Sequence, residues 1–188
     1  MKYYISDTHF HHRNILDFEE RPFNSVDEMN ESLIKKWNNK IKAGDCVYIL
    51  GDLIFARTQE DFLSIVPRLN GQLFLIKGNH DSFLKIKDVE GYFIWIKQYA
   101  QVMDNGQKLA LFHYPIEDWN GRHKGSIHLH GHIHSRTCQV SVITNRYNVC
   151  ADINNYEPCT LQEVIHNNKL FNERRKIEAN NPSVRLTY

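Results

Sequence analysis

Side chains that can bind a metal ion or move a proton follow short apolar runs at five places in the sequence. The clearest case is Gly78-Asn79-His80-Asp81, which comes directly after the continuous apolar run at residues 73–76 and Lys77. The other four are Asp7-Thr8-His9, Gly51-Asp52, His113, and Gly131-His132-Ile133-His134. Ligands of α/β proteins collect at the carboxyl ends of strands, so imidazole, carboxylate and amide oxygen donors at such ends indicate metal chemistry coupled to proton transfer.

The number of donors indicates more than one ion. Nine side chains are available, which exceeds the need of one tetrahedral zinc and suffices for two ions that share a carboxylate. The mixture of donor types suits Zn, Mn, Fe or Ni. The nine are Asp7, His9, Asp52, Asn79, His80, Asp81, His113, His132 and His134.

A pair of ions points to hydrolysis at phosphorus. Two metals about 3.5–4 Å apart stabilise both the attacking and the leaving oxygen of an in-line displacement. The sequence places no cysteine or serine beside a base as a nucleophile. We therefore expect a metal-bridging hydroxide to attack without a covalent intermediate.

The first half of the chain alternates strand and helix patterns that would bring these motifs together. Strands are expected at residues 2–6, 46–50 and 72–77, where apolar residues are nearly continuous. Between them, a helix should begin at Ser25, which forms a capping box with Glu28, and another after Thr58. This order predicts parallel strands joined by right-handed crossovers.

The second half is richer in strand patterns. We expect strands at 92–96, 98–103, 108–112, 126–130, 139–143 and 147–151, with a hairpin at Asp104-Asn105-Gly106. Thr160 and Glu163 form a capping box for a late helix. The expected organisation is one domain over residues 1–166, followed by a polar C-terminal extension at 167–188 that is not a separate domain.

Composition excludes several classes of protein. The 188 residues include 23 Lys and Arg and 22 Asp and Glu, for a net charge of +1, which predicts no broad affinity for nucleic acid. The four cysteines form no C-x-x-C motif and are expected to be reduced. Since no apolar run approaches the ~20 residues that span a bilayer, and residues 3–5 are strand-like rather than a signal peptide, we expect a cytoplasmic protein without membrane contact.

The five motifs, in this order, resemble those of the calcineurin-like metallophosphoesterases, in particular small bacterial or phage-type phosphoesterases. The resemblance covers residues 7 to 134. It implies an α/β fold, a four-layered α/β/β/α sandwich with mixed sheets. It also implies that one ion is held by Asp7, His9, Asp52 and His134, and the second by Asp52, Asn79, His113 and His132, with Asp52 bridging.

The resemblance also implies a general acid. His80 matches the family histidine that contacts phosphate and protonates the leaving group. Asp81 is expected to orient His80 through a hydrogen bond, and a turn or helix-capping role is the alternative. Phe10 departs from the common pattern, in which glycine often follows the first histidine, and this leaves the shape of the pocket lip open.

Four further residues are expected to contact substrate. His12 and Arg13 follow the first motif, and Arg122 and His123 lie in the long loop after His113. Arg13 can hold a phosphate oxygen through two hydrogen bonds. A solvated loop is the alternative for all four.

These features predict a dinuclear metal-dependent phosphoester hydrolase, and more specifically a phosphodiesterase, because no cap domain is recognisable and the site should be open. The partner would be a phosphoester substrate, with a nucleotide or nucleic acid as one class. A phosphomonoesterase acting on nucleotides or phosphoproteins is the near alternative. A non-catalytic scaffold that keeps the fold is the alternative from another class, and the oligomeric state is left open.

Overall fold

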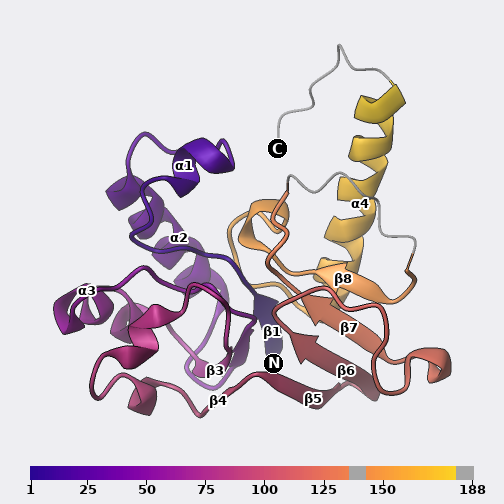
Figure 1. Cartoon of the computed structure of the whole chain (residues 1–188), viewed down its shortest axis with the longest axis horizontal. Helices are drawn as coiled ribbons and strands as arrows, with labels where there is room; N and C mark the ends of the chain where they lie inside the picture. Colours follow the sequence, from indigo (N-terminus) through magenta and orange to yellow (C-terminus); the bar gives the residue numbers. More distant parts are fainter. Residues whose placement is uncertain (136–142, 181–188) are drawn as a thin grey trace.

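The computed structural model describes residues 1–135 and 143–180, and its framework is two four-stranded sheets that face each other (Figure 1). The first sheet has the order β1-β2-β3-β4, and all its neighbours are parallel. Its strands are β1 (Lys2–Ile5), β2 (Cys46–Ile49), β3 (Gln72–Ile76) and β4 (Trp95–Lys97). The three parallel strands expected in the first half are therefore confirmed.

Helices connect the strands of the first sheet and cover its outer face. They are α1 (Ile15–Phe18), α2 (Val26–Lys40) and α3 (Gln59–Leu63). The Ser25 side chain accepts a hydrogen bond from the Glu28 amide, and Thr58 and Asp61 form a complete capping box. Both predicted helix starts are confirmed, whereas the short helix α1 was not expected.

The second sheet is mixed. Its strands are β5 (Tyr99–Asp104), β6 (Gln107–Phe112), β7 (Ile127–His130) and β8 (Arg146–Asn148), in sequential order. The β5 and β6 strands are antiparallel and are joined by the predicted turn, where Asn105 and Gly106 have φ of +46° and +82°. The β6–β7 and β7–β8 pairs are parallel. The strand expected at 139–143 falls almost entirely outside the described residues.

Five short 3₁₀ helices lie in the described connections between the strands and helices. They are η1 (Val66–Arg68), η2 (Ser82–Lys85), η3 (Glu90–Tyr92), η4 (Arg122–Lys124) and η5 (Ala151–Ile153). The last of them leads from the second sheet back toward β1, where Ser6 and Cys150 form a bridge. The ends of β1 and β8 are thereby brought side by side.

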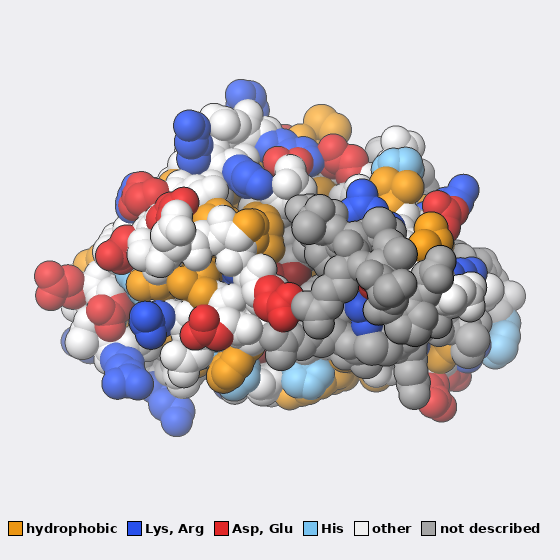
Figure 2. Space-filling view, turned by 90° about the horizontal axis from the view of Figure 1, so that it is seen from above, with side chains coloured by type: hydrophobic (Ala, Val, Ile, Leu, Met, Phe, Trp, Pro, Cys, Tyr) orange, Lys and Arg blue, Asp and Glu red, His pale blue; other side chains and the backbone are white. Residues whose placement is uncertain are grey.

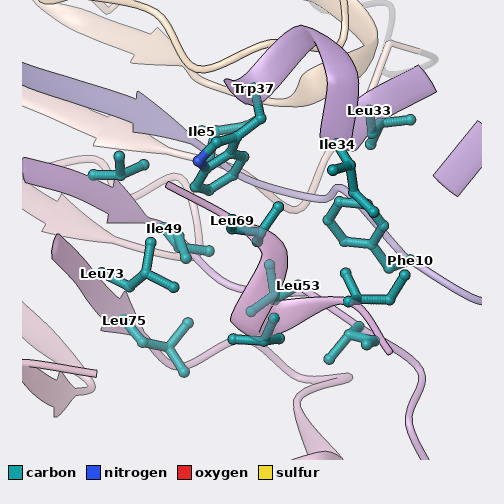
Figure 3. Close-up of a cluster of buried hydrophobic side chains, with 14 of the residues drawn as sticks. Ile5, Phe10, Leu33, Ile34, Trp37, Ile49, Leu53, Leu69, Leu73 and Leu75 are labelled. Carbon is teal, nitrogen blue, oxygen red and sulfur yellow. The ribbon is translucent and has the colours of Figure 1, made fainter. Parts of the chain in front are cut away.

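Two hydrophobic cores hold the layers together. In the first, Trp37, Leu33 and Ile34 of α2 lie over strand residues such as Ile5 and Ile49 (Figure 3). The second lies between the sheets and contains Tyr4, Leu50, Leu109, Leu111 and Leu129. This arrangement confirms the α/β fold with two packed sheets.

The last helix, α4 (Leu161–Asn180), differs from the sequence-based expectation. It continues unbroken past residue 166, so residues 167–180 are part of the helix and not an extension that follows it. Its first turns pack Val164 into the core between the sheets, and Asn168 bonds to the backbone of β8. The fourth layer is thus a helix along the β8 and β1 edge (Figure 1).

The expected cost of disturbing the first core can be measured directly. Leu33→Ala should lower the free energy of unfolding by about 2 to 5 kcal/mol, because the Leu33 side chain is 1% exposed and its removal leaves a cavity. Leu63→Ala is the control, since Leu63 is 41% exposed and should cost less than about 1 kcal/mol. Urea unfolding of both variants tests this, and equal losses would contradict the core assignment.

The surface carries both signs of charge. On the face seen in Figure 2, acidic and basic side chains are interspersed rather than gathered into one basic area. Within the described residues, every helix is too short or too polar to cross a membrane.

Candidate functional site

The predicted ligand residues lie where the strands of both sheets end. Five of them have a left-handed backbone, namely Asp7, His9, Asp52, His132 and His134, with φ between +47° and +71°. This conformation is uncommon outside glycine, and it concentrates at functional sites where the surrounding structure enforces it. Here it turns the chain sharply at each strand end and directs the side chains inward.

Three donors from both sheets form a first cluster. The Nε2 atoms of His9 and His134 face each other at 3.2 Å. Asp7 Oδ1 lies 4.0 Å from the first nitrogen and 3.7 Å from the second. A metal with bonds of about 2.0–2.2 Å places its ligand atoms about 3 to 4 Å apart. The spacing of Asp7, His9 and His134 therefore fits one ion.

Asp52, His113 and His132 form a second cluster. Asp52 Oδ2 lies 3.6 Å from His113 Nε2. The same oxygen lies 3.8 Å from His9 Nε2 of the first cluster. Asn79 Oδ1 is 2.9 Å from His113 Nε2, which brings this predicted ligand to the second cluster. One carboxylate oxygen thus faces both donor groups.

Glycines allow the strand ends to approach this closely. A Cβ at Gly78 would collide with Asp52 Oδ1, and a Cβ at Gly131 would collide with Asp7 Oδ2. The carboxylates therefore lie directly against neighbouring backbone. This explains why the motifs pair glycine with their donors.

Hydrogen bonds and burial favour the metal-binding form of three imidazoles, those of His9, His113 and His132. His113 Nδ1 is 2.7 Å from the Leu50 carbonyl, so this nitrogen donates and leaves Nε2 free to bind a metal. Burial lowers the pKa of His9 well below its ordinary value and also lowers the pKa of His132. Neutral imidazole is the form that binds metals.

Two residues that the sequence motifs did not include support the first cluster. Asp152 Oδ2 lies 3.0 Å from His134 Nδ1, and Arg21 Nε donates to Asp152 Oδ1 at 2.7 Å. Although burial alone would raise the pKa of Asp152, the Arg21 and His134 side chains hold it well below its usual range. Despite the burial of its ring, the bond to Asp152 and the charge of Asp7 raise the pKa of His134.

Arg21 also holds the loop that carries the other ligands of the first cluster. Its Nη2 donates to the Asp7 carbonyl at 2.7 Å and its Nη1 to the Thr8 carbonyl at 2.8 Å. The Arg21 side chain is fully buried, so these bonds are shielded from water. Asp152 follows the apolar run at residues 149–151, so the strand-end rule could have found it, whereas Arg21 carried no local signal.

Cys150, Asp152 and His134 form a third group of possible donors. The Cys150 thiol donates to Asp152 Oδ2 at 3.0 Å, and burial raises its pKa well above the ordinary value. The carboxylate is already engaged by Arg21 and His134. We therefore interpret this group as support for His134 rather than as a separate metal site.

His80 and Asp81 have different surroundings. His80 is exposed at the rim, with its ring centre 5.8 Å from that of His9, and its amide donates to Asp52 Oδ1 at 2.8 Å. Asp81 is buried, and its carboxylate accepts hydrogen bonds from the amides of Asp52, Leu53 and Gly78. Burial raises the pKa of Asp81 to about 6, although the amide bonds oppose this.

Contrary to expectation, the Asp81 carboxylate therefore does not orient His80 by accepting a hydrogen bond from its ring, but accepts from backbone amides instead. Both Asp81 oxygens are occupied by backbone amides, so the side chain fixes the loops that carry Asp52 and Asn79. This corresponds to the turn role left open as the alternative. Asp81 thus positions the site through the backbone of Asp52, Leu53 and Gly78.

The four substrate-contact candidates divide into two pairs. The His12 ring lies 5.4 Å from the His9 ring, at the site, and Arg13 is exposed next to it. Arg122 and His123 are in η4, where Gly125 accepts a hydrogen bond from Gln107 at the start of β6. His113 directly follows the other end of β6. A strand of six residues is roughly 20 Å long, so this distance separates Gln107 from His113. The structure therefore does not bring Arg122 and His123 to the donor clusters.

Phe10 does not form the lip of the pocket. Its side chain is fully buried in the first hydrophobic core, and its backbone forms a bridge with Ile54. The departure from the family pattern at this position therefore affects packing and leaves the donor clusters intact.

Similarity to known proteins agrees with this geometry. A family model described as the calcineurin-like phosphoesterase superfamily domain matches residues 1–151. The uncharacterised protein MJ1445 of Methanocaldococcus jannaschii is 36% identical over 168 residues, covering 87% of this chain and 88% of that protein. The gene 66 protein of Mycobacterium phage L5 is 27% identical over 160 residues, covering 71% of this chain and 77% of its own length.

A solved structure supports the fold alone. The protein of unknown function AQ665 from Aquifex aeolicus has a TM-score of 0.70 at 24% identity, and the match covers 88% of this chain and 98% of that one. The family model spans well over half of the chain and contains all five motifs. The resemblance inferred from the motifs is thereby confirmed, and the chain belongs to the calcineurin-like phosphoesterase superfamily.

Proposed function

We propose that this protein hydrolyses phosphoesters, with a preference for phosphodiesters, by means of two divalent cations. The observation that carries the proposal is the position of Asp52 Oδ2, within 3.8 Å of His9 Nε2 and 3.6 Å of His113 Nε2. A shared oxygen of this kind suits a bridging ligand. The first ion would be held by Asp7, His9, Asp52 and His134, and the second by Asp52, Asn79, His113 and His132.

The nitrogen and oxygen donors suit Mn, Fe, Zn or Ni. When bound, such ions would lower the pKa of bound water and withdraw charge from the phosphoryl oxygens. The chain itself holds the donors in place: Asp152 fixes the tautomer of His134, and the Leu50 carbonyl does the same for His113.

His80 is proposed to donate a proton to the leaving oxygen. Its amide is bonded to Asp52 Oδ1, so its backbone is fixed relative to the clusters while its ring remains exposed to substrate. An alkoxide leaving group needs a proton, which the exposed His80 ring is placed to supply. Asn79 and His80 are both exposed, so the site is open to a substrate with groups on both sides of phosphorus.

The cytoplasmic location expected from the sequence remains part of this proposal. In the described part of the chain, the cysteines at positions 46, 150 and 159 are free thiols, which fits a reducing compartment.

The test is hydrolysis by protein stripped with a chelator and reloaded with Mn, Ni, Zn or Fe. Bis-p-nitrophenyl phosphate and p-nitrophenyl phosphate compare a diester with a monoester. We expect metal-dependent turnover that favours the diester. A preference for p-nitrophenyl phosphate would identify a phosphomonoesterase, and no turnover with two ions bound would favour the non-catalytic scaffold.

His80→Ala tests the general acid. The variant should lose about 10² to 10⁴ in kcat/KM with diphenyl phosphate, and less with bis-p-nitrophenyl phosphate, whose leaving group needs little protonation. His166→Ala, on α4, is the matched control and should retain full activity. Equal losses on both substrates would remove His80 from the acid role.

A further inference from the structure

A row of aromatic rings runs from the site to the protein surface. It consists of His80, Phe55, His12 and Phe18, and we call it the aromatic row. His12 and Phe55 are stacked, with ring centres 3.9 Å apart and planes 4° from parallel. Phe55 lies 5.2 Å from His80 at one end, and Phe18 lies 6.2 Å from His12 at the other. All of these separations are typical of interacting rings or only slightly tighter.

The aromatic row begins at the first donor cluster. The His9 ring centre is 5.4 Å from those of both His12 and Phe55. On the other side of the site, the Tyr114 ring lies 4.9 Å from His113 and 4.6 Å from His132. Any phosphoester that reaches the clusters is therefore flanked by aromatic surface.

The outer part of the row is accessible, unlike the hydrophobic cores. Phe18 is 52% exposed, and Phe55 and His12 are half-buried. None of the three belongs to either cluster of buried core residues in the described chain. Apolar rings exposed beside a reactive site are typical of a binding surface.

We propose that the aromatic row binds a nucleobase in the leaving group of the substrate, so that the substrate is a nucleotide-type phosphodiester. This inference rests on the proposed function of His80. Because His80 is the first ring of the row and is placed to protonate the leaving oxygen, the group attached to that oxygen lies along Phe55, His12 and Phe18. Water adds to phosphorus, and the bond between phosphorus and the nucleoside oxygen breaks. That leaving oxygen takes a proton from His80.

The chemistry of the row sets the expected selectivity. Aromatic rings stack on every base, because each base has a π face, and such stacking is tolerant of sequence. Arg13 is exposed beside His12 and could contact the phosphate, so it would not discriminate among bases. The row should therefore distinguish a base from no base, with little preference among bases.

Equilibrium binding provides a test that needs no turnover. AMP and ribose 5-phosphate share the same phosphate and sugar, and differ only by the base. Calorimetry on the Mn-loaded protein should give a dissociation constant about 10-fold lower for AMP. Phe18→Ala and Phe55→Leu should reduce this difference to near unity while the affinity for ribose 5-phosphate stays constant.

Met103→Ala is the matched control, since Met103 is equally exposed at 52% and lies on β5. It should keep the 10-fold difference. Equal affinities for AMP and ribose 5-phosphate in the unaltered protein would overturn the inference. A variant that weakens both ligands alike would show that the row only supports the fold, and would overturn it as well.

Product analysis tests which side of phosphorus the base occupies. Adenosine 5′-(methyl phosphate) should give adenosine and methyl phosphate, because the base directs the nucleoside side toward His80. AMP and methanol as products would overturn this placement. Comparing a dinucleotide with a longer single strand then separates small nucleotide diesters from nucleic acid.

The two proposals fail in different ways. If the diesters are not hydrolysed but AMP still binds more tightly than ribose 5-phosphate, the binding site stands and the catalytic proposal fails. If diesters are hydrolysed without any preference for the base, the catalytic proposal stands and the aromatic row has no role in recognition.

Discussion

Asp52→Asn is expected to lower kcat/KM for bis-p-nitrophenyl phosphate by about 10³-fold or more. The substitution preserves shape but removes the negative charge of the only carboxylate oxygen, among the described contacts, that faces both donor clusters. Two cations close together depend on such a charge to offset their repulsion. We therefore expect the variant to lose at least one of two bound ions.

Metal analysis by mass spectrometry and steady-state kinetics check this result together. Asp27→Asn is the control, because Asp27 is exposed in the first turn of α2 and its change should leave both readings unaltered. Retention of two ions with activity within tenfold of normal would contradict the bridging role of Asp52.

Arg21→Met is expected to lower the free energy of unfolding by about 3 to 5 kcal/mol. The reason is that Asp152 would remain buried and charged without its partner, since both side chains are almost inaccessible to water. The Asp7 and Thr8 carbonyls would also lose their donors. Urea unfolding measures this loss directly.

Arg68→Met is the matched control for Arg21→Met. Arg68 also pairs with an acid, Glu31, but the two side chains are 44% and 62% exposed. Exposed pairs contribute at most about 1 kcal/mol. Equal losses for the two variants would show that the buried Arg21 pair contributes no more to the free energy of unfolding than an exposed pair.

The Arg21 contacts also predict an effect on metal binding. Asp152→Asn, which is milder, should weaken the ion of the first cluster by about 10 to 100-fold, because the hydrogen bond that orients His134 changes. Competition with a chelator should show one weakened and one unaltered ion. Uniform weakening of both ions would contradict the assignment of Asp152 to the first cluster.

The donor residues could be predicted because their signal is local. In each motif, an apolar strand is followed at once by a donor, and parallel strands bring such ends to one edge. The sequence therefore indicated Asp7, Asp52 and His113 without any knowledge of long-range contacts. The structure brings all seven predicted ligands together at that edge.

The supporting residues could not be predicted in the same way. Arg21 and Asp152 are 131 positions apart, and no spacing rule connects them. Arg122 and His123 were expected at the site because their loop begins there, but a loop's path is not set by its composition. Residues 167–180 were described only as a polar extension, because the apolar spacing fades after residue 166. The buried Asn168, whose side chain bonds to the backbone of Asn148, shows that a polar side chain can hold the helix against β8.

Asp81 shows a further limit of local reasoning. Adjacency to His80 suggested a direct contact, yet consecutive side chains in a tight loop can point in different directions. The structure directs Asp81 into the backbone of the neighbouring strand end. Asp81 therefore affects the site by fixing the backbone of the loops that carry Asp52 and Asn79.

The left-handed backbone at Asp7, His9, Asp52, His132 and His134 has a consequence for protein engineering. These residues occupy a conformation that favours glycine, so each carries a backbone strain of about 1 to 3 kcal/mol that the surrounding contacts must offset. If variants are selected for heat resistance alone, substitutions that relieve this strain should appear at these five positions first. Such substitutions would remove the donor side chains. A thermostable form of this protein should therefore be sought by substitutions in the helices and cores, with the strand ends held constant.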